Sequence, residues 1–242
     1  MFTNTSHRPF PLPKGPWFMT QTWQEVLFAH WPLSPDSLQS KIPEPLEMDT
    51  YNGNAWIGIL PFHLTHLRAR LLPPIPFVQT FPEINVRTYV TYRGQPGIYF
   101  FSLDASHWLT VFGARSFFHL PYHYAHIKIK KKKGYIYYYS QRENNRFEAS
   151  YQPTSPVFTA AKHSLEYWLS ERYRLYTSHK KQLYSLDIHH RPWQLQTADA
   201  VFTKNSLAAS HQISLPSTTP LLHYAKKQKV FFWPLRRCKL EL

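Results

Sequence analysis

Cysteine and glycine are scarce in this sequence of 242 residues, which contains a single cysteine, Cys238, and seven glycines. One cysteine excludes an internal disulfide framework and a zinc site made of several thiolates. No stretch reaches the roughly 18 apolar residues that a membrane-spanning helix needs, and residues 1–17 lack the apolar segment of a secretion signal. These absences predict a cytoplasmic protein without a membrane span.

Acidic side chains are also few. Fourteen Asp and Glu stand against 28 Lys and Arg, which gives a formal charge of +14. Such an excess raises nucleic acid and anionic membranes as candidate partners. A hydrophobic content of 43% suffices for a sizeable core and excludes global disorder. The 17% of aromatic residues and the 21 prolines favour strands over long helices, so we expect a β-rich globular protein.

Strand-like segments separated by turn residues indicate β-hairpins. Residues 84–92 and 98–103 flank a turn that contains Gly and Pro, and Asn52-Gly53 lies between residues 46–51 and 55–60. Further strands are expected at residues 23–31, 125–131, 135–140, 147–151, 173–177, 183–189 and 230–235. Neighbouring hairpins of this kind predict an antiparallel sheet or barrel rather than a parallel α/β sheet.

Three short helices are expected between these strands. Ser34 before Pro35 has the composition of a helix start, and Pro43 ends that helix. Residues 106–118 show helical spacing, with Ser106 as a candidate N-cap, and residues 164–172 form the third helix. The predicted fold class is therefore mainly β with a few short helices.

The chain lacks a Gly/Ser linker, so we predict one domain over residues 21–242, preceded by an extended, proline-rich arm over residues 1–20. Pro73, Pro74 and Pro76 predict a loop inside the domain.

Glu83 is the most informative titratable residue because it lies in an apolar and aromatic context. A carboxylate in such surroundings pairs with a cation or has a raised pKa. Arg87 follows four residues later, and Arg115 comes from the predicted helix. Two interpretations stay open: a structural Glu–Arg pair, or a carboxylate at the floor of a pocket.

Histidines offer a weaker signal. His119, His123 and His126 approach the spacing of metal ligands, but Pro121 prevents the helix that would stack the first two. We therefore predict no metal site. His190 is a candidate for lining a pocket.

The basic tract Lys128–Lys133 falls at a predicted hairpin tip. A lysine-rich turn is usually a solvated edge that resists aggregation. Tyr135, Tyr137 and Tyr139 alternate on one strand face beside it, so a nucleic-acid-binding hairpin is an alternative, although no standard nucleic-acid motif supports it. Nucleic acid is accordingly an unfavoured partner.

Several segments of the chain together carry a family resemblance: residues 28–31 (FAHW), 49–56 (DTYNGNAW), 81–90 (FPEINVRTYV), 94–105 (GQPGIYFFSLDA), 114–115, 120–122 and 171–176 (ERYRLY). These segments resemble the YqjF-like family of uncharacterised bacterial proteins. They span roughly residues 20–235. The family is in turn distantly similar to acetoacetate decarboxylase.

That second resemblance implies an antiparallel, cone-like β barrel around a central cavity, and hints at a homo-oligomer. It places Glu83 and Arg115 on a glutamate and an arginine of the decarboxylase, and Tyr122 and His123 where the decarboxylase has two lysines. Tyr and His cannot form the imine that decarboxylation by that route requires. We therefore expect the cavity without its Schiff-base chemistry, and no cofactor.

The leading prediction is a protein that binds a small organic acid or carbonyl compound in this cavity. The candidate pocket residues are Glu83, Arg87, Arg115, Tyr122, His123 and His190. An enzyme that uses Glu83, Tyr122 or His123 for acid–base chemistry on a small carbonyl substrate is the first alternative, and the nucleic-acid hairpin is the second.

Overall fold

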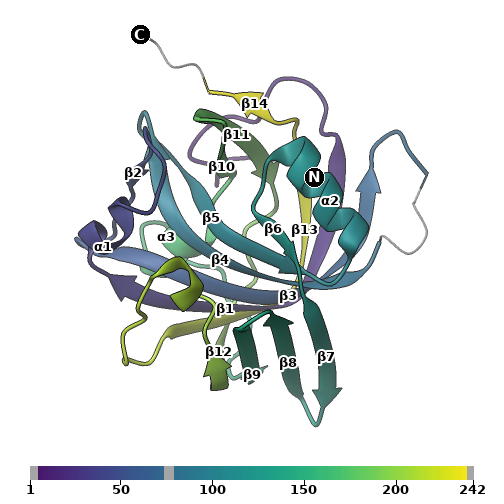
Figure 1. Cartoon of the computed structure of the whole chain (residues 1–242), viewed down its shortest axis with the longest axis vertical. Coiled ribbons are helices and arrows are strands. Elements are labelled where there is room, and N and C mark those ends of the chain that lie inside the picture. Colours follow the sequence, from purple (N-terminus) through teal and green to yellow (C-terminus); the bar gives the residue numbers. More distant parts are fainter. Residues whose placement is uncertain (1–4, 74–78, 239–242) are drawn as a thin grey trace.

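A computed structural model describes residues 5–73 and 79–238, and in these ranges fourteen strands belong to one sheet (Figure 1). The strands are β1 (Met19–Leu33), β2 (Glu47–Met48), β3 (Ala55–Ala69), β4 (Phe81–Tyr92), β5 (Gln95–Ala105), β6 (Tyr122–Tyr124), β7 (His126–Lys132), β8 (Tyr135–Arg142), β9 (Asn145–Pro153), β10 (Arg174–His179), β11 (Gln182–His189), β12 (Gln196–Asn205), β13 (Leu221–Phe232) and β14 (Arg236–Arg237). The helices are α1 (Pro35–Gln39), α2 (Trp108–Phe118), α3 (Leu165–Ser170) and a 3-10 turn at Ala209–His211.

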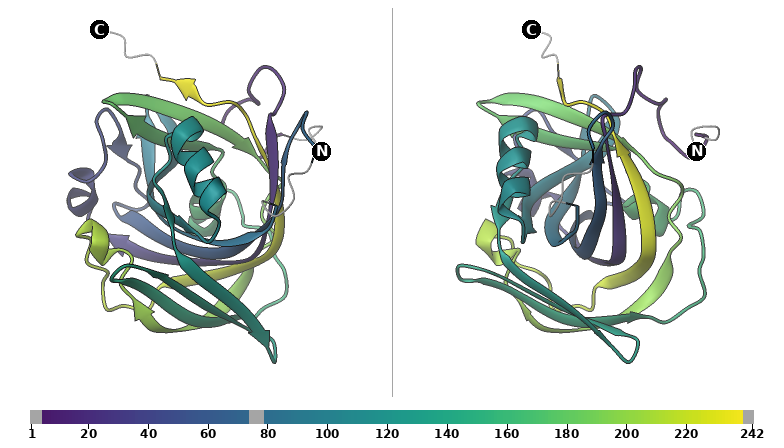
Figure 2. Two further views of the ribbon diagram at one scale, coloured as in Figure 1. Left: turned by 45° about the vertical axis from the view of Figure 1, so that its right-hand side comes forward. Right: turned by 90° about the vertical axis from the view of Figure 1, so that its right-hand side faces the viewer.

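The mainly-β fold class is thus confirmed, and a partial ring dominates it (Figure 2). The path β11-β10-β5-β4-β3-β1-β13 returns on itself, because β11 also pairs with β13 through Ile188–Phe232 and His189–Phe231. Most pairs are antiparallel as predicted, but β10 and β6 each run parallel to β5, so the sheet is mixed.

Beyond the ring, β12, β9, β8 and β7 continue the sheet from β13 and fold under it (Figure 2). Two hydrophobic clusters follow from this arrangement. One cluster joins outward-facing ring residues such as Val86 to Tyr138 and Phe147 of the added strands. The other lies inside the ring and includes Phe62 and Leu103. The ring strands are therefore buried on both faces.

Tight turns form at two of the positions where the sequence predicts them. Arg93 and Gly94 between β4 and β5 both have positive φ, at 51° and 69°. Asn52 and Gly53 also have positive φ, at 50° and 79°. Positive φ at both central residues matches the twist of paired strands.

One of the predicted hairpins is nevertheless wrong. Only the isolated bridge Tyr51–Asn54 forms across Asn52-Gly53, and β2 pairs with β4 instead of β3. The reason is that β1 and β4 occupy the two edges of β3.

Several elements also differ from the prediction. Residues 196–205, expected as short elements and turns, form β12, and β13 begins at Leu221 rather than at residue 230. Its exposed Lys226 and Lys227 interrupt the apolar pattern. Helix α2 is capped by His107, whose ring Nδ1 accepts a hydrogen bond from the Thr110 amide, and not by Ser106.

The arm and the loop lie partly outside the description. Pro74 and Pro76 of the predicted loop fall outside the described residues, as do residues 1–4 of the arm. Strand β1 begins at Met19, so the last two residues of the predicted arm belong to this strand. None of the helices in the described part of the chain is long and apolar enough to cross a membrane.

Candidate functional site

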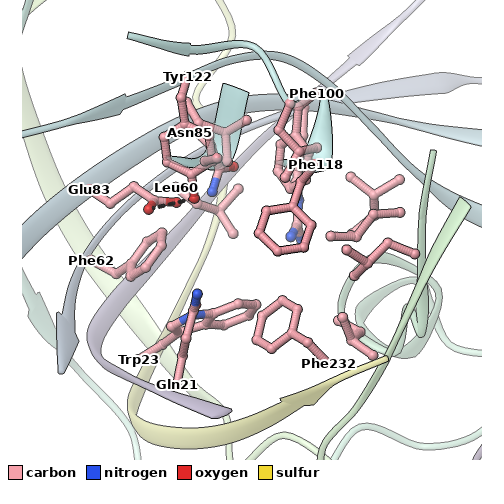
Figure 3. A pocket seen from close by; sticks show the side chains of 18 of the residues that line it. Gln21, Trp23, Leu60, Phe62, Glu83, Asn85, Phe100, Phe118, Tyr122 and Phe232 are labelled. Carbon is pink, nitrogen blue, oxygen red and sulfur yellow. Dashed lines mark hydrogen bonds between the residues drawn. The ribbon is translucent and has the colours of Figure 1, made fainter. Parts of the chain in front are cut away.

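A cavity of about 250 Å³ lies inside the ring, with α2 on one side of it (Figure 3). Aromatic side chains make up much of its wall, and Figure 3 shows Trp23, Phe62, Phe100, Phe118 and Phe232 around the open space. Its polar lining includes three side chains of β4 together with Ser170 at the end of α3 and Arg172 just after it. A volume of this size, below that of drug-binding pockets, suits a small ligand.

Helix α2 closes one side of the cavity with a single face. The lining residues of this helix are Leu109, Thr110, Gly113, Ala114, Phe117 and Phe118. They recur at the spacing of one helical face. Arg115 is not among them; its side chain is exposed.

Strand β4 supplies three polar side chains to the cavity: Glu83, Asn85 and Arg87. Alternate residues of a strand point to the same face, so the intervening Ile84 and Val86 belong to the outer hydrophobic cluster. A rise of roughly 3.4 Å per residue separates Glu83 from Arg87 by about 14 Å along the strand. The cavity therefore has two polar regions.

Glu83 and Tyr122 form the first polar region (Figure 3). Glu83 is 3% exposed, and the Tyr122 hydroxyl donates a hydrogen bond of 2.9 Å to its Oε2. Burial raises the pKa of Glu83 to about 8, against the Tyr122 hydrogen bond, and the charge of Asp104 adds to the rise. Burial and the neighbouring Glu83 also raise the pKa of Tyr122. At neutral pH the pair is mostly uncharged.

Asn85 lies beside this pair (Figure 3), and its Oδ1 is buried without a hydrogen-bond partner among the described residues. An unpaired buried oxygen of this kind is costly unless something else donates to it.

Arg87 and Arg172 form the second polar region, and both are about 95% buried. Arg87 Nη2 donates to the Tyr89 hydroxyl at 3.3 Å and to the Leu169 carbonyl at 3.4 Å, while its Nε has no partner among the described residues. Within the described chain no carboxylate forms an ion pair with Arg87.

Arg172 does have an acidic partner, Asp49, but its Nη2 is also without a hydrogen bond in the described part of the chain. Burial lowers the pKa of Arg172, Asp49 opposes the shift, and the nearby positive charge of Arg87 adds to it. The two guanidinium groups together make this end of the cavity cationic.

His190 lines the cavity and is fully buried. Its ring stacks on Tyr173 with centroids 4.6 Å apart, and its Nδ1 lies 2.8 Å from the Arg191 carbonyl. Burial lowers the pKa of His190 to about 4, so the ring is neutral at physiological pH.

Glu83, Arg87, Tyr122 and His190 are thus brought together, whereas Arg115 and His123 are not among the lining residues. His123 is half-buried near Arg142 and Arg115, and burial together with these charges lowers its pKa to about 4. The position of His123 in β6 explains why Tyr122 lines the cavity and His123 does not. The two are consecutive strand residues, so their side chains point to opposite faces.

Five polar lining residues were missing from the prediction: Gln21, Asn85, Thr110, Ser170 and Arg172. The alternation that places Asn85 on the same face as Arg87 was readable in the sequence. Arg172 follows a short helix, and no periodic pattern marks it.

Sequence comparisons with known proteins identify the family of this chain. The model of the DUF2071 family, described as an uncharacterized conserved protein, matches residues 20–229. The uncharacterized protein YqjF of Bacillus subtilis is 58% identical over 229 residues, which cover 93% of this chain and 95% of that protein. The predicted resemblance to the YqjF-like family is therefore confirmed.

Solved structures show the same fold at low identity. Acetoacetate decarboxylase from Legionella pneumophila superposes with a TM-score of 0.66 at 13% identity, over 96% of this chain and 92% of the other. The enduracididine biosynthesis enzyme MppR, complexed with the condensation product of pyruvate and imidazole 4-carboxaldehyde, superposes with a TM-score of 0.64 at 14% identity. The match covers 93% of this chain and 90% of the other. With an acetoacetate decarboxylase-like fold and this extent of matched sequence, the chain belongs to the DUF2071 family of uncharacterized conserved proteins.

Proposed function

We propose that the cavity binds a small organic acid or carbonyl compound. The observation that carries the proposal is the pair of buried guanidinium groups, Arg87 and Arg172, each with a nitrogen that lacks a hydrogen-bond partner among the described residues. Buried cations are costly when unpaired. A carboxylate supplies both the missing charge and the missing acceptors, because guanidinium binds it through two parallel hydrogen bonds.

The other polar region suits an uncharged oxygen. Neutral Glu83 and Tyr122 together offer one free O–H donor, because the other proton makes the hydrogen bond between them, and Asn85 Oδ1 needs a donor. A carbonyl oxygen can accept from the free O–H, and a hydroxyl group can also donate to Asn85. The aromatic wall between the two regions favours an apolar linker in the ligand.

The fold family makes a small acid a reasonable ligand, since MppR has been seen with pyruvate. The described lining residues of this cavity include no lysine, so they offer no amine for imine formation with a ketone. We therefore propose that these lining residues bind the ligand without a covalent bond.

Thermal shift and calorimetric titration with pyruvate, acetoacetate and phenylpyruvate test the proposal. Arg87→Met should abolish the stabilisation that an acid of this panel gives to the parent protein, because the ligand loses its charged contact. Arg115→Met is the matched control, since this exposed arginine lies on α2 but does not line the cavity. Equal binding by both variants, or no binding by the parent protein, would overturn the proposal.

Acid–base catalysis is the second candidate, and the pKa of Glu83 favours it. A carboxyl group with a pKa of about 8 holds and releases its proton near neutral pH, as a general acid or base must. We propose as its reaction class proton transfer at the carbon beside a carbonyl group. Exchange of that proton in heavy water, followed by NMR, should stop in Glu83→Gln, whereas exchange unaffected by this change would eliminate the role.

The nucleic-acid alternative finds little support in the placement of its lysines. Strand β7 is the last strand of the sheet path, and Lys131 forms an ion pair with Glu25. A lysine-rich edge strand of this kind protects a sheet against unwanted pairing. We further propose a cytoplasmic location, in keeping with Cys238 as a free and buried thiol.

A further inference from the structure

The mouth of the cavity is marked by side chains that line it and are also exposed. Leu109 and Phe117 of α2 both contact the cavity, yet they are 45% and 73% exposed. The cavity therefore opens to the surface along α2.

The outer side of α2 continues this apolar surface. Trp108 and Phe112, one helical turn apart, are 63% and 66% exposed, and Arg115 follows in the same stripe. Helices at the surface of water-soluble domains usually turn polar residues outward, so an outer stripe with two aromatic residues requires an explanation.

The end of β3 forms the second side of the mouth. Leu67 lines the cavity, and Phe118 at the end of α2 stacks on Phe18 with ring centroids 5.3 Å apart. The Phe18 carbonyl accepts a hydrogen bond of 2.7 Å from the Arg70 amide, which ties residues 68–72 to this rim. Leu71 in that segment is 90% exposed.

We call α2 and residues 68–72 together the mouth face. Its only formal charges are Arg68, Arg70 and Arg115, and none of the three forms an ion pair with a carboxylate of the described chain. The sequence contains no Asp or Glu between residues 50 and 82 or between residues 105 and 142. The mouth face is therefore both apolar and purely cationic.

We propose that the mouth face docks on an anionic lipid surface. Exposed aromatic and leucine side chains insert into the headgroup region, and arginines beside them attract anionic lipids. A second copy of the chain is a less suitable occupant, because two such faces would bring six arginines together without a compensating acid. Docking would present the open cavity to the membrane.

Sedimentation with vesicles tests this inference without reference to the ligand of the cavity, so it can fail or succeed independently of the proposed function. The parent protein should bind vesicles that contain both phosphatidylcholine and phosphatidylglycerol, and it should not bind vesicles made only of phosphatidylcholine. Binding to the anionic vesicles should weaken as the salt concentration rises. Changing Arg68→Gln and Arg70→Gln together should weaken binding about 30-fold, since each arginine near an anionic surface contributes about fivefold. Trp108→Ser with Phe112→Ser should weaken it by at least about tenfold, through lost apolar burial.

The matched control is Lys132→Gln with Lys133→Gln. It removes the same charge from the turn after β7, which lies at the other end of the molecule from α2 (Figures 1 and 2). The control should keep the parent affinity. The inference is overturned by an equal loss in the control, by absence of binding to the anionic vesicles, or by light scattering that shows a dimer which Trp108→Ser with Phe112→Ser turns into monomers. Circular dichroism identifies any variant that does not fold.

Discussion

The Tyr122 hydroxyl donates a 2.9 Å hydrogen bond to Glu83 Oε2, and this bond joins β6 to β4 across the intervening β5. Both partners are buried, and burial raises both of their pKa values. Burial, acting against this hydrogen bond, keeps the Glu83 carboxyl group mostly protonated near neutral pH, so the cavity has a neutral group where a charged acid would otherwise repel an anionic ligand.

Glu83 should make stability depend on pH. Its pKa rises from an ordinary 4.5 to about 8 on folding, so the folded state binds the proton more tightly than the unfolded state. The resulting stabilisation is complete below about pH 4.5 and is lost as the pH rises through about 8. Glu83→Gln should therefore gain in free energy of unfolding relative to the parent protein between about pH 5 and about pH 8. Urea unfolding across this range measures the difference, and parallel curves would contradict the assignment.

Tyr122→Phe should destabilise the protein, because it removes the donor that a buried carboxyl group uses. We expect a loss of about 1–3 kcal/mol in the free energy of unfolding. The pKa of Glu83 should rise further, because the lost hydrogen bond lowers it. Tyr124→Phe on the same strand is the control, since Tyr124 is exposed and should tolerate the change. Equal losses in the two variants would show that the hydrogen bond is not the cause.

Two glycines should respond to alanine with opposite signs. A Cβ at Gly97 would lie 2.5 Å from the Tyr176 ring and 3.0 Å from the Arg174 carbonyl, so Gly97→Ala should cost about 1–3 kcal/mol. A Cβ at Gly113 meets no atom within 4 Å, and alanine favours the middle of α2 by about 0.5–1 kcal/mol. Thermal unfolding of both variants gives the comparison, and a stabilised Gly97→Ala would contradict the close packing of β5 on β10.

The ion pair between Asp104 and Arg142 should be important for stability. Arg142 Nε lies 3.1 Å from both carboxylate oxygens, and the Asp104 side chain is almost fully buried. Arg142→Gln would leave that carboxylate unpaired, with an expected loss of about 3 kcal/mol. The exposed pair of Arg146 and Glu148 offers the control, in which Arg146→Gln should change stability little. Chemical unfolding at neutral pH distinguishes the two, and similar small effects would mean that water screens Asp104.

Local signals explain what the sequence predicted of the fold. The turn at Arg93-Gly94 and the apolar strands around it specify β4 and β5 without help from the rest of the chain. Strand β12 gave no such signal, because its residues alternate between half-buried and exposed positions and it owes its form to pairing with β9. Pairing partners distant in sequence decide such strands.

The candidate site was predictable to a similar degree. Glu83 and Arg87 are four residues apart on a strand that the sequence pattern predicts well. Because alternate residues of a strand point to the same face, the sequence was enough to place both on one face. The helical spacing over residues 106–118 did not show which face of the helix would be buried, and the structure leaves Trp108, Phe112 and Arg115 exposed. The arginine that joins Arg87 in the cavity from outside β4 is Arg172 and not Arg115. The position of Arg172 depends on how α3 packs on the ring.

The alternation along β4 also sets a limit on changes in its length. Glu83, Asn85 and Arg87 line the cavity, and Ile84 and Val86 pack on the other face. A one-residue deletion or insertion next to Asn85 would exchange the two faces over the rest of the strand, which would send a guanidinium group into a hydrophobic layer. Natural variation in this strand should therefore consist of substitutions, and gaps should be confined to the turns at its ends.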